Sequence, residues 1–259
     1  MRAGEFHNTP DNIGLLQALR EVLEMRGAIL AFGWRDLKVR YMHTFLGWGW
    51  MLLPALLLLL PALMLQIRFG INHENLSLWL TALSGHILSA GLIQQLAPLW
   101  INNKHFLLKI RLPVLFLPVS RLIVLLPEWA LYSFVLIGLG MYSGLSVEFV
   151  FLQWLVVQLF VIFGFSAGLI LCALSGRLRD VLHAVPVLIQ GQLLIVVLYL
   201  LKGEDLGILT WLEWLPPVSF IRIVKDSEGT VLVALSTLVL FLFSAFAYVK
   251  VSKNALERI

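Results

Sequence analysis

The sequence predicts an all-α polytopic membrane protein. Hydrophobic residues make up 60% of its 259 residues and charged residues only 13%, which is more apolar surface than a soluble domain can bury. The apolar residues gather in long runs separated by short charged loops. Lysine and arginine are also divided unevenly between the two sides of these runs. Together these observations indicate that a bilayer is the solvent for most of the chain.

Six of the apolar runs are long enough to cross a bilayer as helices, because a hydrocarbon core about 30 Å thick needs about 20 apolar helical residues. Barrel strands would alternate in polarity and be about half as long. The fifth run is short for a straight crossing, so we expect it to be tilted, extended at one end or incomplete. The predicted spans are residues 46–67, 78–100, 119–141, 149–175, 186–201 and 230–251.

The distribution of Lys and Arg orients these spans, because cytoplasmic loops carry an excess of both residues. Six spans place both termini on one side. Fourteen basic residues fall on that side and four on the other, with Arg121 at a span end left out. We therefore expect both termini in the cytoplasm. The net charge of +4 then follows from topology, and the scatter of basic residues over short loops argues against a nucleic-acid surface.

One membrane domain is expected. Residues 1–45 form a cytoplasmic N-terminal segment, 46–251 a six-helix transmembrane domain and 252–259 a cytoplasmic tail. The N-terminal residues are polar and lack the isolated apolar stretch of a cleavable signal peptide. The first span is therefore expected to act as an uncleaved membrane signal. The single cysteine, Cys172, lies inside the fourth span and excludes an intrachain disulfide.

The N-terminal segment carries an amphipathic helix pattern. Thr9 and Pro10 are typical of a helix start, and the pattern then runs toward His43 with expected breaks near two glycines, Gly27 and Gly33. This pattern predicts a helix lying flat at the cytoplasmic interface, although an ordinary packed helix leading into the first span would look similar. Its predicted apolar face consists of Leu30, Trp34, Leu37 and Tyr41.

Two connections are too apolar to be simple loops. Residues 101–118 mix basic and apolar side chains, which predicts a short surface helix at the membrane boundary. Residues 206–215 are apolar but too few to span, and Pro216 and Pro217 end them. A re-entrant or interfacial outer hairpin between spans five and six is therefore expected, with Trp211 and Trp214 at headgroup level.

The sequence lacks the motifs of several nucleotide-binding, metal-binding and catalytic sites. The chain has no GxxxxGK[ST] phosphate cradle for a nucleotide, no HExxH and no GxSxG. The six histidines show no paired spacing, so we expect no metal site and no cofactor in this chain.

Ionisable residues inside spans are costly and are functional candidates by default. Three stand out: His86, Arg121 and Glu128. Arg121 can extend to the interface, and His86 fits a neutral hydrogen-bonded role better than a proton relay. Glu128 lies on the same helix face as Arg121 but about 10 Å away along the axis, so either a cavity or interface surrounds it or it is paired locally.

Two further features bear on packing and on a conduit. Trp48 and Trp50 at the start of the first span suit an interfacial aromatic belt, or a ring stack for a sugar at the mouth of a conduit. Gly164 and Gly168 form a GxxxG motif in the fourth span, which predicts close helix packing without naming the partner helix.

Three stretches together resemble the permeases of type-2 ABC exporters of the polysaccharide class. RDLKVRYMHTFLGWGWMLLP (residues 35–54) resembles their interface helix and first span. NNKHFLLKIRLPVLFLP (102–118) resembles their cytoplasmic coupling region, and SGRLRDVLHAVPVLIQ (175–190) resembles their turn into span five. The O-antigen and teichoic-acid exporters are the nearest in pattern, and capsule exporters come next.

The resemblance implies a half-transporter in a bacterial cytoplasmic (inner) membrane. Two copies would form a conduit for a lipid-linked glycan, as in lipopolysaccharide biosynthesis, and separate ATP-binding cassette subunits would bind ATP and Mg. Conduit candidates are Trp48, Trp50, His86, Arg121 and Glu128. The resemblance assigns contact with the ATPase to Arg35, Asp36, Lys38, Arg40, Lys104, Lys109, Arg111, Arg177, Arg179 and Asp180.

Other functions remain open at the level of sequence. A membrane enzyme acting on a lipid-linked sugar would need clustered carboxylates or histidines at a membrane face. Another ABC-type exporter is compatible with the same pattern. A secondary transporter would favour an inverted repeat, which the sequence does not display.

Overall fold

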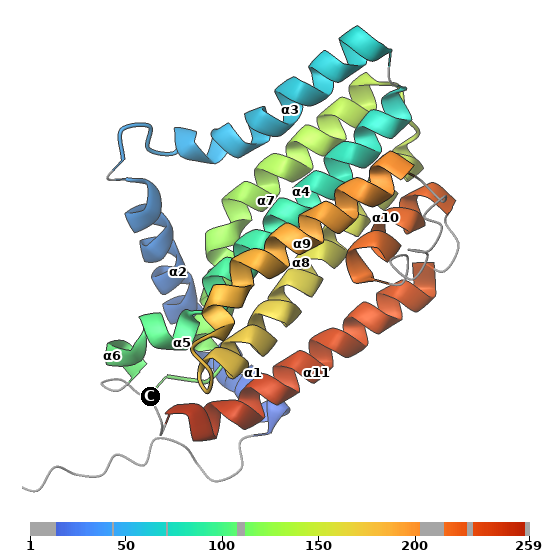
Figure 1. Ribbon diagram of the computed structural model, residues 1–259. Coiled ribbons are helices and arrows are strands. Elements are labelled where there is room, and N and C mark those ends of the chain that lie inside the picture. The colour runs from blue at the N-terminus through green and yellow to red at the C-terminus, as the bar shows by residue number, and fades with distance from the viewer. Residues whose placement is uncertain are drawn as a thin grey trace, which may run out of the picture.

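The computed structural model describes residues 14–42, 44–70, 72–107, 112–202, 215–226 and 230–256, and helices are the only regular secondary structure in this part of the chain. Figure 1 shows long helices packed side by side, with α2 set at an angle to them. The helices are α1 (Leu15–Glu24), α2 (Arg26–Tyr41), α3 (Gly49–Phe69), α4 (His73–Leu96), α5 (Leu99–Asn102), α6 (Lys104–Leu107), α7 (Phe116–Tyr142), α8 (Val147–Ser175), α9 (Val181–Lys202), α10 (Pro216–Asp226) and α11 (Thr230–Leu256).

Five of these helices are long and apolar enough to cross a membrane: α4, α7, α8, α9 and α11. Each overlaps a predicted span, so the prediction of an all-helical protein with several spans is confirmed. The first predicted span overlaps α3, a helix of 21 residues in which Arg68 is the single charged residue. The total of six crossings stays a prediction.

Two span boundaries differ from the predicted ones. The fifth span is extended at its beginning, because α9 starts at Val181 and includes Pro186. The second span was predicted to run through Trp100, but α4 ends at Leu96. Pro98 cannot continue the helix, and after a turn Trp100 lies in the separate short helix α5.

The centre of the fold is the close approach of α4 and α8. A Cβ atom added at Gly164 would lie 2.5 Å from the Cα of Ser89, and one added at Gly168 would lie 2.8 Å from the Cβ of Leu96. The GxxxG motif of α8 therefore packs against α4 of the same chain. Small residues permit this contact, which van der Waals packing must stabilise because lipid provides little hydrophobic drive between helices.

Buried amides add hydrogen bonds between the same helices. The Nε2 of Gln153 on α8 donates to the Oγ of Ser77 on α4 at 2.7 Å. The Nε2 of Gln192 on α9 donates to the Oγ of Ser89 on α4 at 2.9 Å. Such pairs satisfy polar groups that lipid could not hydrogen-bond. They join α8 to the first half of α4 and α9 to its second half.

The two ends of the bundle are built from different connections. A surface pocket is lined by residues of both the α3–α4 and the α7–α8 turns, which places these turns at one end. At the other end, the Oγ of Ser175 donates to the carbonyl of Ala97 at 2.7 Å, and the Nε1 of Trp100 donates to the hydroxyl of Tyr248 at 2.7 Å. The α4–α5 turn, the end of α8 and the second half of α11 therefore lie together there. Helix α1 also packs against α11, so this end carries the described N-terminal helix and the described end of the chain.

The predicted outer hairpin is described only in its second part. Residues 206–214 lie outside the described residues, and α10 begins at Pro216, where proline suits the first turn of a helix. The Phe220 ring meets the Phe160 ring of α8 edge-on, with centroids 5.1 Å apart. With 11 residues α10 is too short to span, and it packs into the bundle against α8, α4 and α9.

We predict that Gly164→Ala lowers the free energy of unfolding by about 1–3 kcal/mol, because the new methyl group would collide with the backbone of α4. Thermal unfolding in detergent measures this change. Gly138→Ala on α7 is the matched control, since nothing lies within 4 Å of its Cβ position. An equal loss in both variants would contradict the α4–α8 contact.

Candidate functional site: the polar seam between α2 and α7

Helix α2 packs along the first part of α7, and the two helices run in the same direction. The Phe32 ring meets the Phe116 ring with centroids 5.6 Å apart. A Cβ atom added at Gly33 would lie 2.7 Å from the Cβ of Ile123. Gly33 is thus a close-packing residue inside α2, so the break predicted near Gly33 is wrong, whereas the break predicted near Gly27 is found two residues earlier. The break lies at Met25, between α1 and α2.

The buried face of α2 also differs from the predicted one. Leu30 and Trp34 are 56% and 49% exposed, although Leu37 and Tyr41 are buried as predicted. The buried residues of α2 recur every four positions. Residues four apart lie on the same face of a helix, so together they form the face that packs against α7. They are Ile29, Gly33, Leu37 and Tyr41.

Charged side chains beside this stripe join α2 to α7. An Nη1–Oδ2 distance of 2.9 Å pairs Arg121 with Asp36, and an Nη1–Oε1 distance of 3.4 Å pairs Arg40 with Glu128. The hydroxyl of Tyr41 donates to the same Oε1 of Glu128 at 2.7 Å. We call these five residues the polar seam. Arg121 and Glu128 therefore find separate partners on α2, and both carboxylates are neutralised by arginine.

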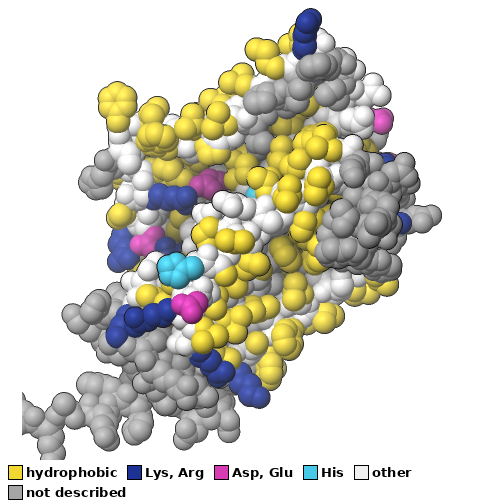
Figure 2. Space-filling view, viewed as in Figure 1, with side chains coloured by type: hydrophobic (Ala, Val, Ile, Leu, Met, Phe, Trp, Pro, Cys, Tyr) yellow, Lys and Arg dark blue, Asp and Glu magenta, His cyan; other side chains and the backbone are white. Residues whose placement is uncertain are grey.

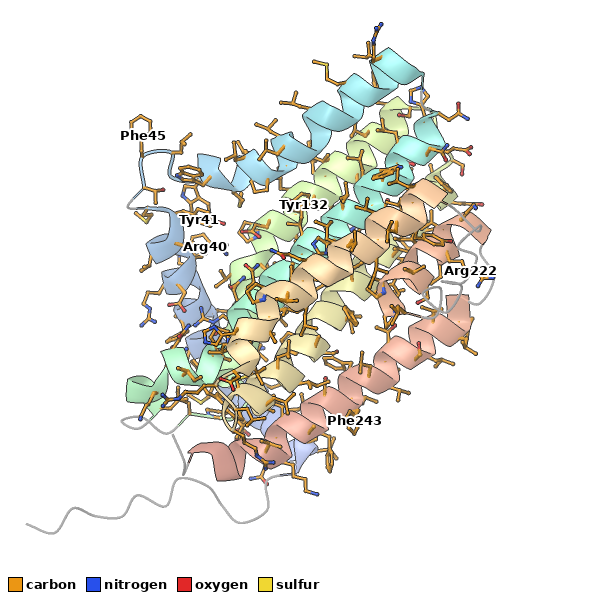
Figure 3. All side chains as sticks on the ribbon, in the orientation of Figure 1. Arg40, Tyr41, Phe45, Tyr132, Arg222 and Phe243 are labelled. Atoms are coloured by element: carbon orange, nitrogen blue, oxygen red, sulfur yellow. The ribbon has the colours of Figure 1, made fainter. Side chains whose placement is uncertain are left out.

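The seam reaches well into the bundle. Glu128 lies twelve residues after Phe116, the first residue of α7, which corresponds to about 18 Å along the helix axis. Figure 3 shows Arg40 and Tyr41 at the end of α2 on the side of α7, from which Tyr132 projects. The end of α2 is thus fastened near the middle of a membrane-crossing helix.

Tyr41 acts in the seam as a neutral donor. Burial and the hydrogen bond to Glu128 raise the pKa of Tyr41 to about 12. The folded state therefore favours the protonated phenol, and the stability it contributes is present below pH 10 and is lost as the pH rises toward 12. The Tyr41–Glu128 hydrogen bond consequently persists at every physiological pH.

A pocket of about 300 Å³ opens beside the seam, between α2, α4 and α7. Figure 2 shows basic and acidic side chains gathered on this face of the molecule, surrounded by apolar surface. Three of the pocket's lining residues are charged and belong to the seam. The lining consists of Asp36, Val39, Arg40, Gln95, Arg121 and Val124.

Aromatic rings cover the end of α2 where the chain turns into α3. Trp48 stacks on Tyr41 with ring centroids 5.5 Å apart, and Trp34 lies 6.2 Å from Trp48. The turn contains Gly47 at a φ of 52°, a left-handed conformation that favours glycine. Trp48 and Trp50 are 40% and 44% exposed, so both offer ring surface outside the packed bundle.

His86 lies apart from the ion pairs of the seam, on α4. Its side chain is buried, and its Nδ1 has no hydrogen-bond partner among the described residues. Within the same residues no three His, Cys, Asp or Glu side chains come together as a possible metal site.

The candidate ATPase-contact residues fall into three groups. Asp36 and Arg40 belong to the seam, whereas Arg35 is 58% exposed and Lys38 points its ammonium toward the Trp34 ring. Lys104 lies on α6, and Lys109 and Arg111 lie outside the described residues. An exposed turn between α8 and α9 carries Arg177, Arg179 and Asp180.

The partners of Arg121 and Glu128 were missed at the level of sequence. The signal that could have found them is charge order: Asp36 then Arg40 on α2 is opposite in sign to Arg121 then Glu128 on α7. Gln95 was missed altogether, because an amide near a helix end carries no distinctive pattern.

We predict that Arg40→Glu lowers the free energy of unfolding by about 1 kcal/mol, because it sets two carboxylates against each other at a site where Arg40 is 45% exposed. The double variant Arg40→Glu with Glu128→Arg should regain most of this loss. Thermal unfolding measures the stability of both variants. The control is Lys38→Glu on the same helix, because Lys38 has no carboxylate partner in the described part of the chain. The pairing would be refuted if the double variant were as unstable as the sum of its single changes.

Comparison with known proteins supplies one informative relative. No family model matches the chain. The chain is similar to the O-antigen export system permease protein RfbA of Myxococcus xanthus, with 28% identity over 174 residues. This match covers 66% of the chain and 67% of the relative. Together with the five apolar helices, it identifies a multi-pass membrane protein and confirms the resemblance to polysaccharide-exporter permeases.

Proposed function

We propose that this chain is the permease subunit of an ABC transporter that exports a lipid-linked polysaccharide, such as O antigen, across the bacterial cytoplasmic membrane. The observation that carries the proposal is the similarity to an O-antigen export permease over two thirds of both chains. The helical bundle with several apolar spans supports it, because a conduit for a large polar substrate needs several membrane-crossing helices.

A separate ATPase supplies the energy in this proposal. The sequence contains no phosphate-cradling motif for a nucleotide. The exposed Arg177, Arg179 and Asp180 lie in the α8–α9 turn, at the same end of the bundle as α1, α5 and α6. This end offers charged side chains next to short helices, which suits the docking of a soluble subunit.

The polar seam supports a route for the coupling. ATP binding can shift the permease only through differential contacts with its two conformations. Helix α2 is held to α7 by ion pairs, a hydrogen bond and the close contact at Gly33. A displacement of α2 therefore moves α7 with it, which carries motion from the docking end to the middle of the bundle.

Two copies of the chain complete the conduit in this proposal. Large apolar side chains of α11, including Leu235, Val239 and Phe243, are exposed and available to lipid or to a second copy. Figure 3 shows Phe243 projecting from α11 away from the other helices.

The orientation of the chain gives one prediction. In a Cys172→Ser background, Arg20→Cys on α1 should react with a membrane-impermeant maleimide only after the cytoplasmic side is opened. Ser143→Cys, in the turn at the other end of the bundle, should react in intact spheroplasts. The background is suitable because Cys172 is buried and is the only cysteine. Labelling of Arg20→Cys in intact spheroplasts would overturn the orientation.

The partner gives a second prediction. The purified chain should hydrolyse no ATP by itself, and it should co-purify with an ATP-binding cassette ATPase encoded beside it. Reversing charge in the α8–α9 turn with Arg179→Glu and Asp180→Lys should lower the yield of the complex about tenfold, since charge-assisted contacts contribute about 1.5–3 kcal/mol. Arg68→Glu at the end of α3 is the control. ATP hydrolysis or glycan transport by the chain alone would contradict the proposal.

A further inference from the structure

Helix α1 presents three faces of different chemistry. Each face is built from residues three or four positions apart, the spacing that aligns side chains along one side of a helix. The first packs against the protein core and consists of Leu15, Ala18 and Val22. The second is polar and consists of Gln17, Arg20, Glu21 and Glu24. The third, which we call the leucine face, consists of Leu16, Leu19 and Leu23.

The polar face suits water and is held together by its own side chains. The Nε2 of Gln17 donates to the Oε1 of Glu21 at 3.4 Å, and the Nε of Arg20 donates to the Oε1 of Glu24 at 3.1 Å. Both bonds join residues four positions apart, which are neighbours on a helix surface. Both also lie at exposed positions. This face therefore accounts for its own polar groups in contact with solvent.

The leucine face is exposed although it is apolar. The side chains of Leu16, Leu19 and Leu23 are 83%, 46% and 69% exposed. A single exposed leucine is ordinary on a protein surface, but three in a row form a contiguous apolar stripe. Stripes of this kind mark contact with a membrane or with another protein. The level of α1 in the bundle decides between the two.

Helix α1 lies at the level where a membrane span ends. It packs against α11 at one end of the bundle (Figure 1). Ala18 shares a core cluster with three buried residues of α11, which are Ala245, Tyr248 and Val249. The apolar part of α11 ends at Ser252, and Ala245 lies only about 10 Å before that end along the axis. The packing therefore sets α1 near one boundary of the hydrocarbon core.

Lys250 marks the headgroup level on α11. It is the first charged residue of this helix, which is uncharged from Thr230 to Val249. A lysine is costly within the hydrocarbon core, so its place on a span indicates where the headgroups begin. Lys250 follows directly after Tyr248 and Val249, which belong to the cluster that contains Ala18. The leucine face of α1 thus lies where headgroups and acyl chains meet.

We propose that α1 is an interfacial helix whose leucine face inserts among the lipids at the boundary between headgroups and acyl chains. Its core face holds it to the bundle, and its polar face meets water. Amphipathic helices that lie on a membrane divide their surface in this way. The sequence pattern placed this role farther along the chain, on a face that includes Leu37 and Tyr41, but those residues are buried in α2.

The insertion of α1 holds the beginning of α2. Only Met25 separates the two helices, so the lipid contact fixes the first turn of α2 at the membrane boundary. The polar seam fastens the other end of α2 to α7. This role is independent of the proposed transport function and needs no ATPase.

The test measures what surrounds each face of α1. It uses the full chain with Cys172→Ser, because Cys172 is buried and is the only cysteine. One new cysteine at a time carries a bimane label. Leu16→Cys and Leu23→Cys report on the leucine face, and Gln17→Cys and Glu24→Cys are matched controls on the polar face. The chain is placed in nanodiscs of dioleoyl phosphatidylcholine, with either a nitroxide near the headgroup end of an acyl chain or iodide in the water.

We expect the nitroxide lipid to quench the two leucine-face labels about twofold or more strongly than the controls, because an interfacial helix buries its apolar face about 5–10 Å into the boundary of headgroups and acyl chains. Iodide stays in water and should quench in the opposite order. All four labelled positions are exposed, so the labels leave the packed core intact. Thermal unfolding of each labelled chain checks this.

Each outcome decides the proposal. Stronger lipid quenching of the leucine-face labels than of the controls supports it. Equal lipid quenching of the four labels, or iodide quenching of all four alike, would overturn it, since the leucine face would then not be the one in lipid. Weak quenching of the leucine-face labels by both agents would also overturn it and would indicate cover by a second copy of the chain. Because neither ATPase nor glycan is present, failure of the transport proposal cannot produce these negative results.

Discussion

The constraint on which the rest of this structure depends is that lipid provides no hydrogen-bond partners. Every backbone amide within the bilayer must be satisfied inside its own segment, which makes helices the natural solution for the long apolar runs. The same constraint acts on side chains. Gln153 and Gln192 pair with serines of α4, and Trp100 pairs with Tyr248. The charges of α7 are balanced by α2, which a water-exposed helix would not require.

Packing in this bundle rests on small residues. Gly164 and Gly168 bring α8 close enough to α4 for backbone contact, and Gly33 does the same for α2 against α7. Because lipid tails are as apolar as leucine, close contact of this kind stabilises helix association more than the burial of apolar surface does. The α4–α8 pair lies at the centre of the bundle, whereas the α2–α7 contact adds ion pairs to the same kind of close packing.

That difference connects the fold to the proposed function. A transporter needs one part that stays rigid and another that has two arrangements. The seam combines ion pairs and a tyrosine hydrogen bond, so its free energy can respond to force on α2. The aromatic cluster of Trp34, Tyr41 and Trp48 adjoins the seam, because Tyr41 belongs to both, and Trp48 lies where the chain turns into α3. Events at the seam therefore bear directly on the position of the first predicted span.

The sequence by itself determined the solvent of this protein, its helical class and the approximate place of its spans. Composition and run length suffice for this, because the thickness of a bilayer fixes how many apolar residues a crossing needs. The sequence also singled out Arg121 and Glu128 as unusual, since ionisable residues are rare within spans. Only the tertiary structure decided their partners, Asp36 and Arg40 with Tyr41, because pairing across two helices depends on their rotation and relative height. The same reason explains why Leu30 and Trp34 face outward, why Gly33 packs where a break was expected, and why Gln95 lies at a pocket that no sequence pattern marks.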